Sequence, residues 1–167
     1  MDFRFYLVKH RITRDLNKIL IEIGQGMKQI HSLGYVHRDL KPENIVLNLK
    51  PLSVKLIDFN RSYLMTQNTR GTVRGTPGYF PMNDNLKDGS VLWDIWAFAA
   101  IILESDMDVN EYKEVMSERG SLAKATKHLE KKEVCDHLKD IIRGTLLRVK
   151  IVEMISLDEI LELLKKV

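Results

Sequence analysis

The stretch that decides the fold is His37-Arg38-Asp39-Leu40-Lys41-Pro42-Glu43-Asn44. It places a carboxylate, a primary amine and a carboxamide close together, just after a long helical pattern. Three further motifs follow along the chain, and they are Asp58-Phe59-Asn60, Gly75-Thr76-Pro77-Gly78-Tyr79 and Asp94-Ile95-Trp96. Four motifs in this order make a chance pattern negligible.

Residue for residue, segment 37–44 resembles the catalytic loop of the Ser/Thr protein kinases. Residues 58–60 are similar to their metal-binding Asp-Phe-Gly, and residues 75–79 look like their substrate-facing loop. The resemblance covers essentially the whole chain. It implies one domain over residues 1–167 with an activation segment over 58–83. In that family this is only the larger C-terminal lobe, so the expected fold is mainly α with a small antiparallel β ribbon.

The resemblance also implies roles for the polar residues, because phosphoryl transfer depends on positioning and charge neutralisation. Asp39 would accept or orient the proton of the attacking hydroxyl, and Lys41 would offset charge on the transferring phosphoryl group of ATP. Asn44 and Asp58 would supply the hard oxygen ligands that Mg²⁺ prefers. Asp94 would accept backbone N–H groups of the 37–44 loop. Alternatively, Asp39 and Asn44 only fix the loop by hydrogen bonds in a non-catalytic relative.

Four more residues have structural or regulatory roles by resemblance. His37 is expected to pack against Phe59 rather than to exchange protons. Arg38 pairs with a phosphorylated activation loop in many kinases, or bonds carbonyl groups here. Thr76 would hydrogen-bond at the 37–44 loop, or serve as an ordinary turn residue. Candidate phosphorylation sites, for which an unmodified loop is the alternative, are Thr66, Thr69 and Thr72.

Hydrophobic spacing predicts the helices around these motifs. A helix is expected from Thr13, its N-cap, to a stop at Gly34, because apolar residues recur at helical spacing between them. Residues 91–103 are apolar nearly all round, which is typical of a helix buried on all sides. Ser156 and Glu159 form a capping box that begins the last helix.

Short β-rich runs at 45–47 and 54–57 predict a small antiparallel ribbon. Residues 60–78 are rich in Thr, Arg and Gly without a period, and we expect a loop there. Gly24 and Gly26 lie inside the first long helix with no strand before them, so we interpret them as close packing sites rather than a phosphate-binding loop.

The composition is that of an ordinary globular protein. Its 167 residues suit one domain, and 44% are hydrophobic and 29% charged. A net charge of +3 without a basic, aromatic-interleaved stripe argues against nucleic acid as a partner. The lone Cys135 favours a reducing compartment. The longest apolar run, 91–103, is too short for a bilayer, so we expect a soluble cytoplasmic or nuclear protein with no membrane partner.

Three departures from the family pattern qualify the resemblance. Only residues 1–12 precede the first long helix, without the glycine-rich loop, strand lysine and partner glutamate that hold ATP, so we expect an open half-site with poor ATP affinity. Asn60 replaces a glycine, which suggests altered loop switching. The glutamate of the family's Ala-Pro-Glu falls at Met82 or Asn83 and its arginine partner at Met154, so an apolar contact between Met82 and Met154 is expected.

Two functions follow from these observations. The chain transfers phosphate from Mg-ATP to protein Ser/Thr once an N-terminal lobe is supplied upstream or by another chain, or it is a pseudokinase-like scaffold. In either case we expect an uncovered apolar face that a protein partner, the missing lobe or a second copy covers. Its residues would be Phe3, Phe5, Tyr6, Leu7 and the strand Val54–Ile57.

Overall fold

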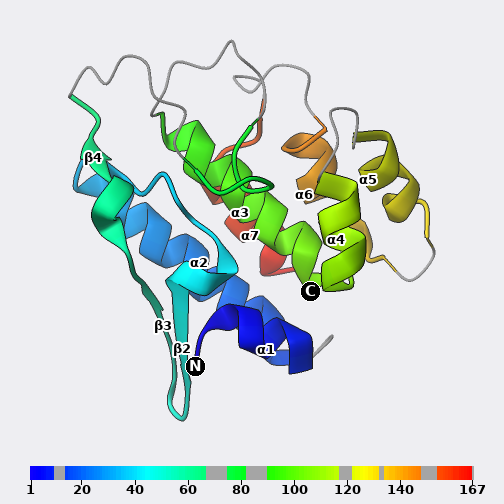
Figure 1. Cartoon of the computed structure of the whole chain (residues 1–167), viewed down its shortest axis with the longest axis horizontal. Coiled ribbons are helices and arrows are strands. Elements are labelled where there is room, and N and C mark those ends of the chain that lie inside the picture. Colours follow the sequence, from blue (N-terminus) through cyan, green and yellow to red (C-terminus); the bar gives the residue numbers. More distant parts are fainter. Residues whose placement is uncertain are drawn as a thin grey trace.

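Figure 1 shows the computed structural model, in which a body of helices carries a two-stranded hairpin. The structure describes residues 1–9, 14–66, 75–81, 90–116, 122–131, 134–147 and 154–166. The α-helices in these ranges are α1 (Phe3–Lys9), α2 (Arg14–Ser32), α3 (Val91–Ser105), α4 (Val109–Met116), α5 (Leu122–Leu129), α6 (Asp136–Gly144) and α7 (Leu157–Leu164). The strands and 3-10 helices are β1 (Tyr35–Val36), η1 (Pro42–Asn44), β2 (Ile45–Leu49), β3 (Leu52–Leu56), η2 (Phe59–Arg61) and β4 (Tyr63–Leu64). A mainly α fold with small antiparallel sheets is therefore confirmed.

Helix α3 lies at the centre of the body, where α2, α4 and α6 each contact it. Ser90 begins the helix, because its side-chain oxygen accepts a hydrogen bond from the backbone N–H of Leu92 at 3.3 Å. Every residue from Trp93 to Ser105 is buried except the half-buried Trp96. The prediction of a helix buried on all sides over 91–103 is confirmed.

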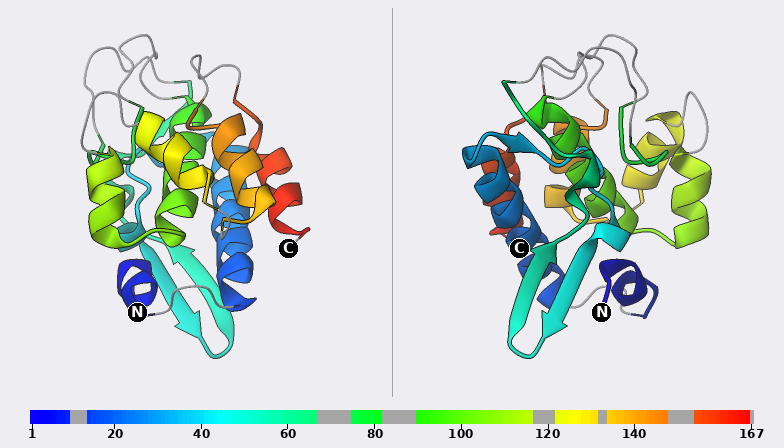
Figure 2. Two further views of the ribbon diagram at one scale, coloured as in Figure 1. Left: turned by 90° about the vertical axis from the view of Figure 1, so that its right-hand side faces the viewer. Right: turned by 60° about the vertical axis from the view of Figure 1, so that its left-hand side comes forward.

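Helix α2 runs along α7 and supports the hairpin, since β3 packs on it (Figure 2). Its buried stripe contains Ile19, Ile23 and Met27. The chain leaves the helix through Gly34, whose φ of 81° is the left-handed conformation that glycine adopts without steric cost. The predicted stop is confirmed, while the predicted N-cap, Thr13, lies outside the described residues.

The hairpin of β2 and β3 matches the predicted ribbon and is longer by a few residues. Its register pairs Ile45 with Leu56 and Leu49 with Leu52. A second antiparallel pair, β1 with β4, was not predicted, and it lies partly in the segment 60–78 that we expected to be a loop. Strands of two residues are too short for an alternating pattern to reveal them.

Helix α1 corrects the expectation of a broad uncovered apolar face. Phe3, Tyr6 and Leu7 are buried in the core, and only Phe5 is exposed, by 48%. Residues three and four apart lie on one face of a helix, so α1 buries that face against η1 and β2. Of the strand residues, Val54 and Leu56 are half-buried against the core, and Ile57 is 39% exposed.

The C-terminal helix α7 begins as the sequence predicts. The Ser156 side chain accepts the Glu159 backbone N–H at 3.2 Å, and the Glu159 carboxylate accepts the Ser156 backbone N–H at 2.8 Å. Both halves of the capping box are therefore present. Met154, just before it, is half-buried against the core, whereas Met82 and Asn83 lie outside the described residues, so their predicted contact with Met154 stays a prediction.

Close packing explains one of the two glycines inside α2. A Cβ at Gly24 would lie 2.6 Å from Leu161 Cδ2 and 3.3 Å from the Phe98 ring. A Cβ at Gly26 would lie 3.4 Å from Leu56, which is ordinary van der Waals contact. The interpretation as a close packing site is confirmed for Gly24 and wrong for Gly26.

Alanine substitutions at these two glycines should therefore differ in their effect on stability. Gly26→Ala should raise the free energy of unfolding by about 0.5–1 kcal/mol, because alanine favours a helix interior. Gly24→Ala adds a contact that costs about 1–3 kcal/mol by overpacking, so its gain is cancelled or reversed. Urea unfolding of the two variants measures the difference. Equal stabilisation by both would contradict the packing of α7 on α2.

Candidate functional site

The 37–44 loop is fixed from below by Asp94, in the first turn of α3. One carboxylate oxygen of Asp94 accepts the backbone N–H of His37 at 2.8 Å, and the other accepts that of Arg38 at 2.9 Å. His31 of α2 donates from Nε2 to the same carboxylate at 2.8 Å. Asp94 is only 1% exposed, so this buried carboxylate joins α2, α3 and the loop.

His37 is fully buried, and its contacts are those of a packing residue. Its ring centroid lies 4.8 Å from that of Phe59. Its Nε2 donates to the carbonyl of Ile57 at 3.0 Å, so the ring proton is on Nε2. These contacts are those expected if His37 packs against Phe59.

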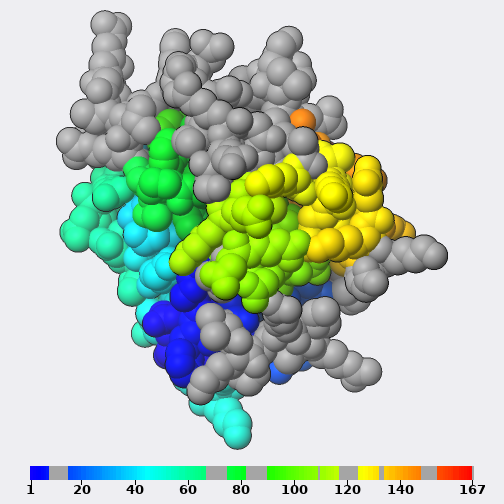
Figure 3. Space-filling model, turned by 45° about the vertical axis from the view of Figure 1, so that its right-hand side comes forward, coloured from blue at the N-terminus to red at the C-terminus, as the bar shows by residue number. Residues whose placement is uncertain are grey.

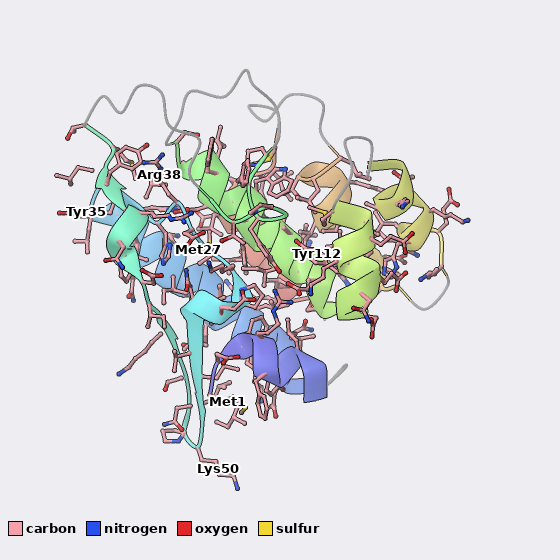
Figure 4. All side chains as sticks on the ribbon, in the orientation of Figure 1. Met1, Met27, Tyr35, Arg38, Lys50 and Tyr112 are labelled. Carbon is pink, nitrogen blue, oxygen red and sulfur yellow. The ribbon has the colours of Figure 1, made fainter. Side chains whose placement is uncertain are left out.

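Arg38 lies at the end of the molecule where β1 and β4 pair (Figure 4). It has a positive φ of 67°, and its guanidinium lies 5.0 Å from the centre of the Tyr63 ring. Arg38 is 7% exposed. Of the candidate phosphorylation sites, Thr66 is exposed, and Thr69 and Thr72 lie outside the described residues.

Asp39, Lys41 and Thr76 form a closed set of hydrogen bonds. The Thr76 hydroxyl donates to Asp39 Oδ1 at 2.8 Å, and Lys41 Nζ donates to Thr76 Oγ1 at 2.8 Å. Lys41 Nζ also donates to Asp39 Oδ2 at 3.2 Å. Residues from two distant motifs are therefore brought together around one carboxylate.

A second cation, Arg61, lies at the same carboxylate and was not predicted. Its Nη1 is 3.6 Å from Asp39 Oδ1. Burial raises the pKa of the Asp39 carboxyl, but hydrogen bonds from Thr76 and Lys41 and the charges of Lys41 and Arg61 outweigh burial. The pKa of Asp39 therefore lies below its ordinary value. The only signal in the sequence was a basic residue directly after residues 58–60.

Removing the threonine hydroxyl should raise the pKa of Asp39. Thr76→Val removes one of the hydrogen bonds that lower the pKa of Asp39, while burial still raises it. The Asp39 carboxyl should therefore titrate at a higher pH than in the wild type. Carboxyl ¹³C NMR titration measures this shift. Lys18→Met, which removes an exposed cation paired with Asp15, is the matched control and should leave Asp39 unchanged.

The same shift has a consequence for stability. Because the pKa of Asp39 is lower in the folded than in the unfolded chain, its carboxylate stabilises the fold above the unfolded pKa of about 3.9. That contribution is lost as the pH falls through the folded pKa. Thr76→Val should lose part of it at neutral pH. A pKa of Asp39 that is identical in the variant and the wild type would contradict the geometry.

Asn44 and Asp58 lie where two backbone segments pair. Asn44 donates from Nδ2 to the backbone carbonyl of Asp39 at 2.8 Å, so its amide oxygen is the atom suited to bind a cation. The backbone N–H of Ile57 donates to the carbonyl of Asn44 at 2.9 Å, which brings Asp58 next to it. Asp58 is exposed and has no side-chain hydrogen bond to cap η2.

Asn44 and Asp58 suit a Mg²⁺ ion that takes its remaining oxygen ligands from a bound phosphate compound. Mg²⁺ takes oxygen ligands and is usually bound by one or two protein side chains together with substrate phosphates. Among the described residues, no group of three or more His, Cys, Asp or Glu side chains is placed to hold a metal ion. An amide oxygen and a carboxylate on adjacent segments would therefore need the phosphate oxygens of ATP to complete the coordination.

The backbone conformation of residues 58–60 shows whether position 60 requires a glycine. The residue with a left-handed conformation is Asp58, with φ 64° and ψ 66°, whereas Asn60 lies inside η2. Aspartate is among the residues that tolerate this conformation. The replacement of glycine at position 60 therefore needs no positive φ in this structure.

Comparison with known proteins agrees with this geometry. Residues 5–164 match the family described as protein kinase domain. The match covers nearly the whole chain, so the chain belongs to the eukaryotic-type protein kinase family. Among the residues that the structure describes, no helix has both the length and the apolar run that a membrane span requires.

The curated relatives are Ser/Thr and related kinases. The chain is 32% identical over 102 residues to serine/threonine-protein kinase PKH1 of Saccharomyces cerevisiae, covering 50% of this chain and 13% of the relative. It is 34% identical over 93 residues to MAP kinase kinase skh1/pek1 of Schizosaccharomyces pombe, covering 54% and 25%. It is 34% identical over 91 residues to calcium/calmodulin-dependent protein kinase type 1B of Rattus norvegicus, covering 53% and 26%. The aligned part is about a quarter or less of each relative.

Proposed function

We propose that this chain is the C-terminal lobe of a Ser/Thr protein kinase and transfers the γ-phosphoryl group of ATP to a protein hydroxyl when an N-terminal lobe completes the site. The observation that supports this most directly is the closed set of Asp39, Lys41 and Thr76 on a loop fixed by Asp94. Such a set combines an acceptor for a proton, a cation and a hydroxyl that orients both.

The chemistry assigns one task to each side chain. A substrate hydroxyl oxygen forms the new bond to phosphorus as the bond to the ADP oxygen breaks, and Asp39 orients the hydroxyl and accepts its proton. Lys41 lies beside Asp39 and offsets negative charge on the transferring group. Asn44 and Asp58 would hold Mg²⁺, which neutralises the phosphate oxygens when bound.

The described residues leave the proposed nucleotide site open to solvent. Ile57 and Phe59, which follow the hairpin next to Asp58, are 39% and 47% exposed. A ligand site normally buries most of its ligand, so Mg-ATP should bind weakly. A thermal-shift titration tests this, and marked stabilisation by micromolar Mg-ATP would contradict the open half-site.

A non-catalytic scaffold is the second candidate, and one observation favours it. Groups of the chain itself occupy both oxygens of Asp39, with Thr76 and Arg61 at Oδ1 and Lys41 at Oδ2. A carboxylate held in this way with a lowered pKa is a poorer proton acceptor.

Adding an N-terminal lobe separates the two candidates. The chain is fused to the N-terminal lobe of the Saccharomyces cerevisiae relative, and phosphate transfer to a Ser/Thr peptide library is measured. A catalytic Asp39 predicts that Asp39→Asn lowers the rate by about 10²–10⁴-fold, while the surface variant Lys18→Met has no effect. Transfer no higher in the wild-type fusion than in Asp39→Asn, with ATP bound, would establish the scaffold instead.

A further inference from the structure

Arg4 is the second residue of α1, and its side chain makes polar contacts with η1, α3 and the 75–81 segment. Its Nε donates to Glu43 Oε1 at 3.0 Å, and its Nη2 donates to the Tyr79 hydroxyl at 2.6 Å. Its Nη1 forms an ion pair with Glu104 of α3. Each nitrogen of the guanidinium therefore faces a different acceptor.

The network is anchored in the core of the protein. The side chain of Glu104 is 0% exposed and that of Arg4 is 21% exposed. The Tyr79 hydroxyl donates to Glu104 Oε2 at 2.5 Å. Burial raises the pKa of Tyr79 to about 12, so its phenol stays protonated at neutral pH and remains a donor. A buried carboxylate of this kind needs its cation.

Both outer partners of Arg4 lie beside the proposed catalytic set. Glu43 is in η1, two residues after Lys41, and Tyr79 is three residues after Thr76. The backbone N–H of Tyr79 donates to the carbonyl of Thr76 at 3.0 Å. Figure 3 shows the N-terminal residues, in blue, at the surface between the cyan and the yellow-green parts of the chain.

A second contact holds the same segment from α4. The hydroxyl of Tyr112, labelled in Figure 4, donates to the carbonyl of Gly78 at 2.8 Å, and its ring centroid lies 5.6 Å from that of Tyr79. The 75–81 segment is thus held through its backbone by α4 and through its tyrosine by α1 and α3.

We propose that Arg4 is a positioning residue, which holds Tyr79 and Glu43 on the buried Glu104 and thereby keeps Thr76 against Asp39. Its meaning for catalysis rests on the proposed function. Arginine suits this task because its planar group offers five N–H donors in fixed directions. A lysine would satisfy the charge of Glu104 and could not hold all three partners in this arrangement.

Arg4→Lys tests the proposal because it keeps the cation. Amide hydrogen exchange is followed by NMR, together with the titration of the Asp39 carboxyl. Exchange of the Tyr79 amide should become about ten-fold faster or more, as the loss of a charge-assisted hydrogen bond predicts. The pKa of Asp39 should move upward, in the same direction as in Thr76→Val, while the amides of α2 and α3 keep their rates.

Two further variants complete the design. Lys28→Met removes an exposed cation that pairs with Asp158, and it should change neither readout. Arg4→Met/Glu104→Met replaces the buried carboxylate and its half-buried cation by apolar side chains, so this double variant takes the place of Arg4→Lys if Arg4→Lys does not fold. It should also accelerate exchange at Tyr79.

An unchanged Tyr79 amide in Arg4→Lys, or an equal acceleration of all amides, would overturn the proposal and leave Arg4 as a stabilising ion pair only. These measurements need no phosphate transfer. If the fused kinase is inactive while Tyr79 and Asp39 respond as expected, the proposed function fails and the positioning of the 75–81 segment by Arg4 stands.

Discussion

Asp94→Ala is expected to destabilise the protein by about 2–6 kcal/mol, because each of two buried backbone N–H groups left without an acceptor costs about 1–3 kcal/mol. Those groups belong to His37 and Arg38, and the carboxylate that they face is 1% exposed. The loss of the His31 contact adds to the effect. A domain of this size has a free energy of unfolding of about 5–15 kcal/mol in total. The Asp94→Ala variant should therefore unfold at a clearly lower urea concentration than the wild type.

Urea unfolding followed by circular dichroism measures this loss. Asp158→Ala is the matched control, because Asp158 pairs with Lys28 at the surface, where such a pair contributes about 0–1 kcal/mol. Asp94→Asn keeps one oxygen acceptor and should lie between alanine and the wild type. If Asp94→Ala unfolds within about 1 kcal/mol of the wild type, the 37–44 loop does not depend on α3.

Phe3→Ala should cost about 3–5 kcal/mol, as large aromatic truncations in a core do. Phe3 is fully buried, and its ring centroid lies 6.1 Å from that of Tyr6 in a stacked arrangement. Removing the ring leaves a cavity where α1 packs against η1 and β2.

Phe5→Ala provides the comparison within the same helix. Phe5 is 48% exposed, so its truncation should change the free energy of unfolding by less than about 1 kcal/mol. Thermal unfolding of both variants, at equal concentration, gives the contrast. Equal small effects at both positions would instead support an uncovered apolar face at residues 3–7.

The elements that the sequence predicted are those with a local signal. Helix α3 has a long apolar run that only Asp94 interrupts over residues 91–103, and α7 has a capping box; both signals are visible in a short window of sequence. Helix α1 has only seven residues. A helix of that length does not form alone in water, because nucleation is unfavourable. Its existence depends on packing against η1 and β2, which no window of sequence contains.

The candidate site also contains residues with a local sequence signal and residues without one. The motif residues Asp39, Lys41 and Thr76 were named from their motifs, and they lie together. Arg61 and Arg4 were not named, because their roles arise from contacts across the fold. Arg4 and Glu104 are one hundred positions apart in the chain, and nothing in the spacing of charged residues indicates that they meet.

The first two residues continue the sheet, which matters for anyone who expresses this protein. The Met1 carbonyl accepts the Leu47 backbone N–H at 2.7 Å, the Met1 amino group donates to the Leu47 carbonyl at 3.1 Å, and Asp2 bridges Val46. An affinity tag joined at Met1 would leave along the open side of β2, where it competes with these bonds or adds a strand that recruits neighbouring molecules. The far end of α7 carries the exposed Lys165 and Lys166, so a tag placed after them leaves the hairpin undisturbed.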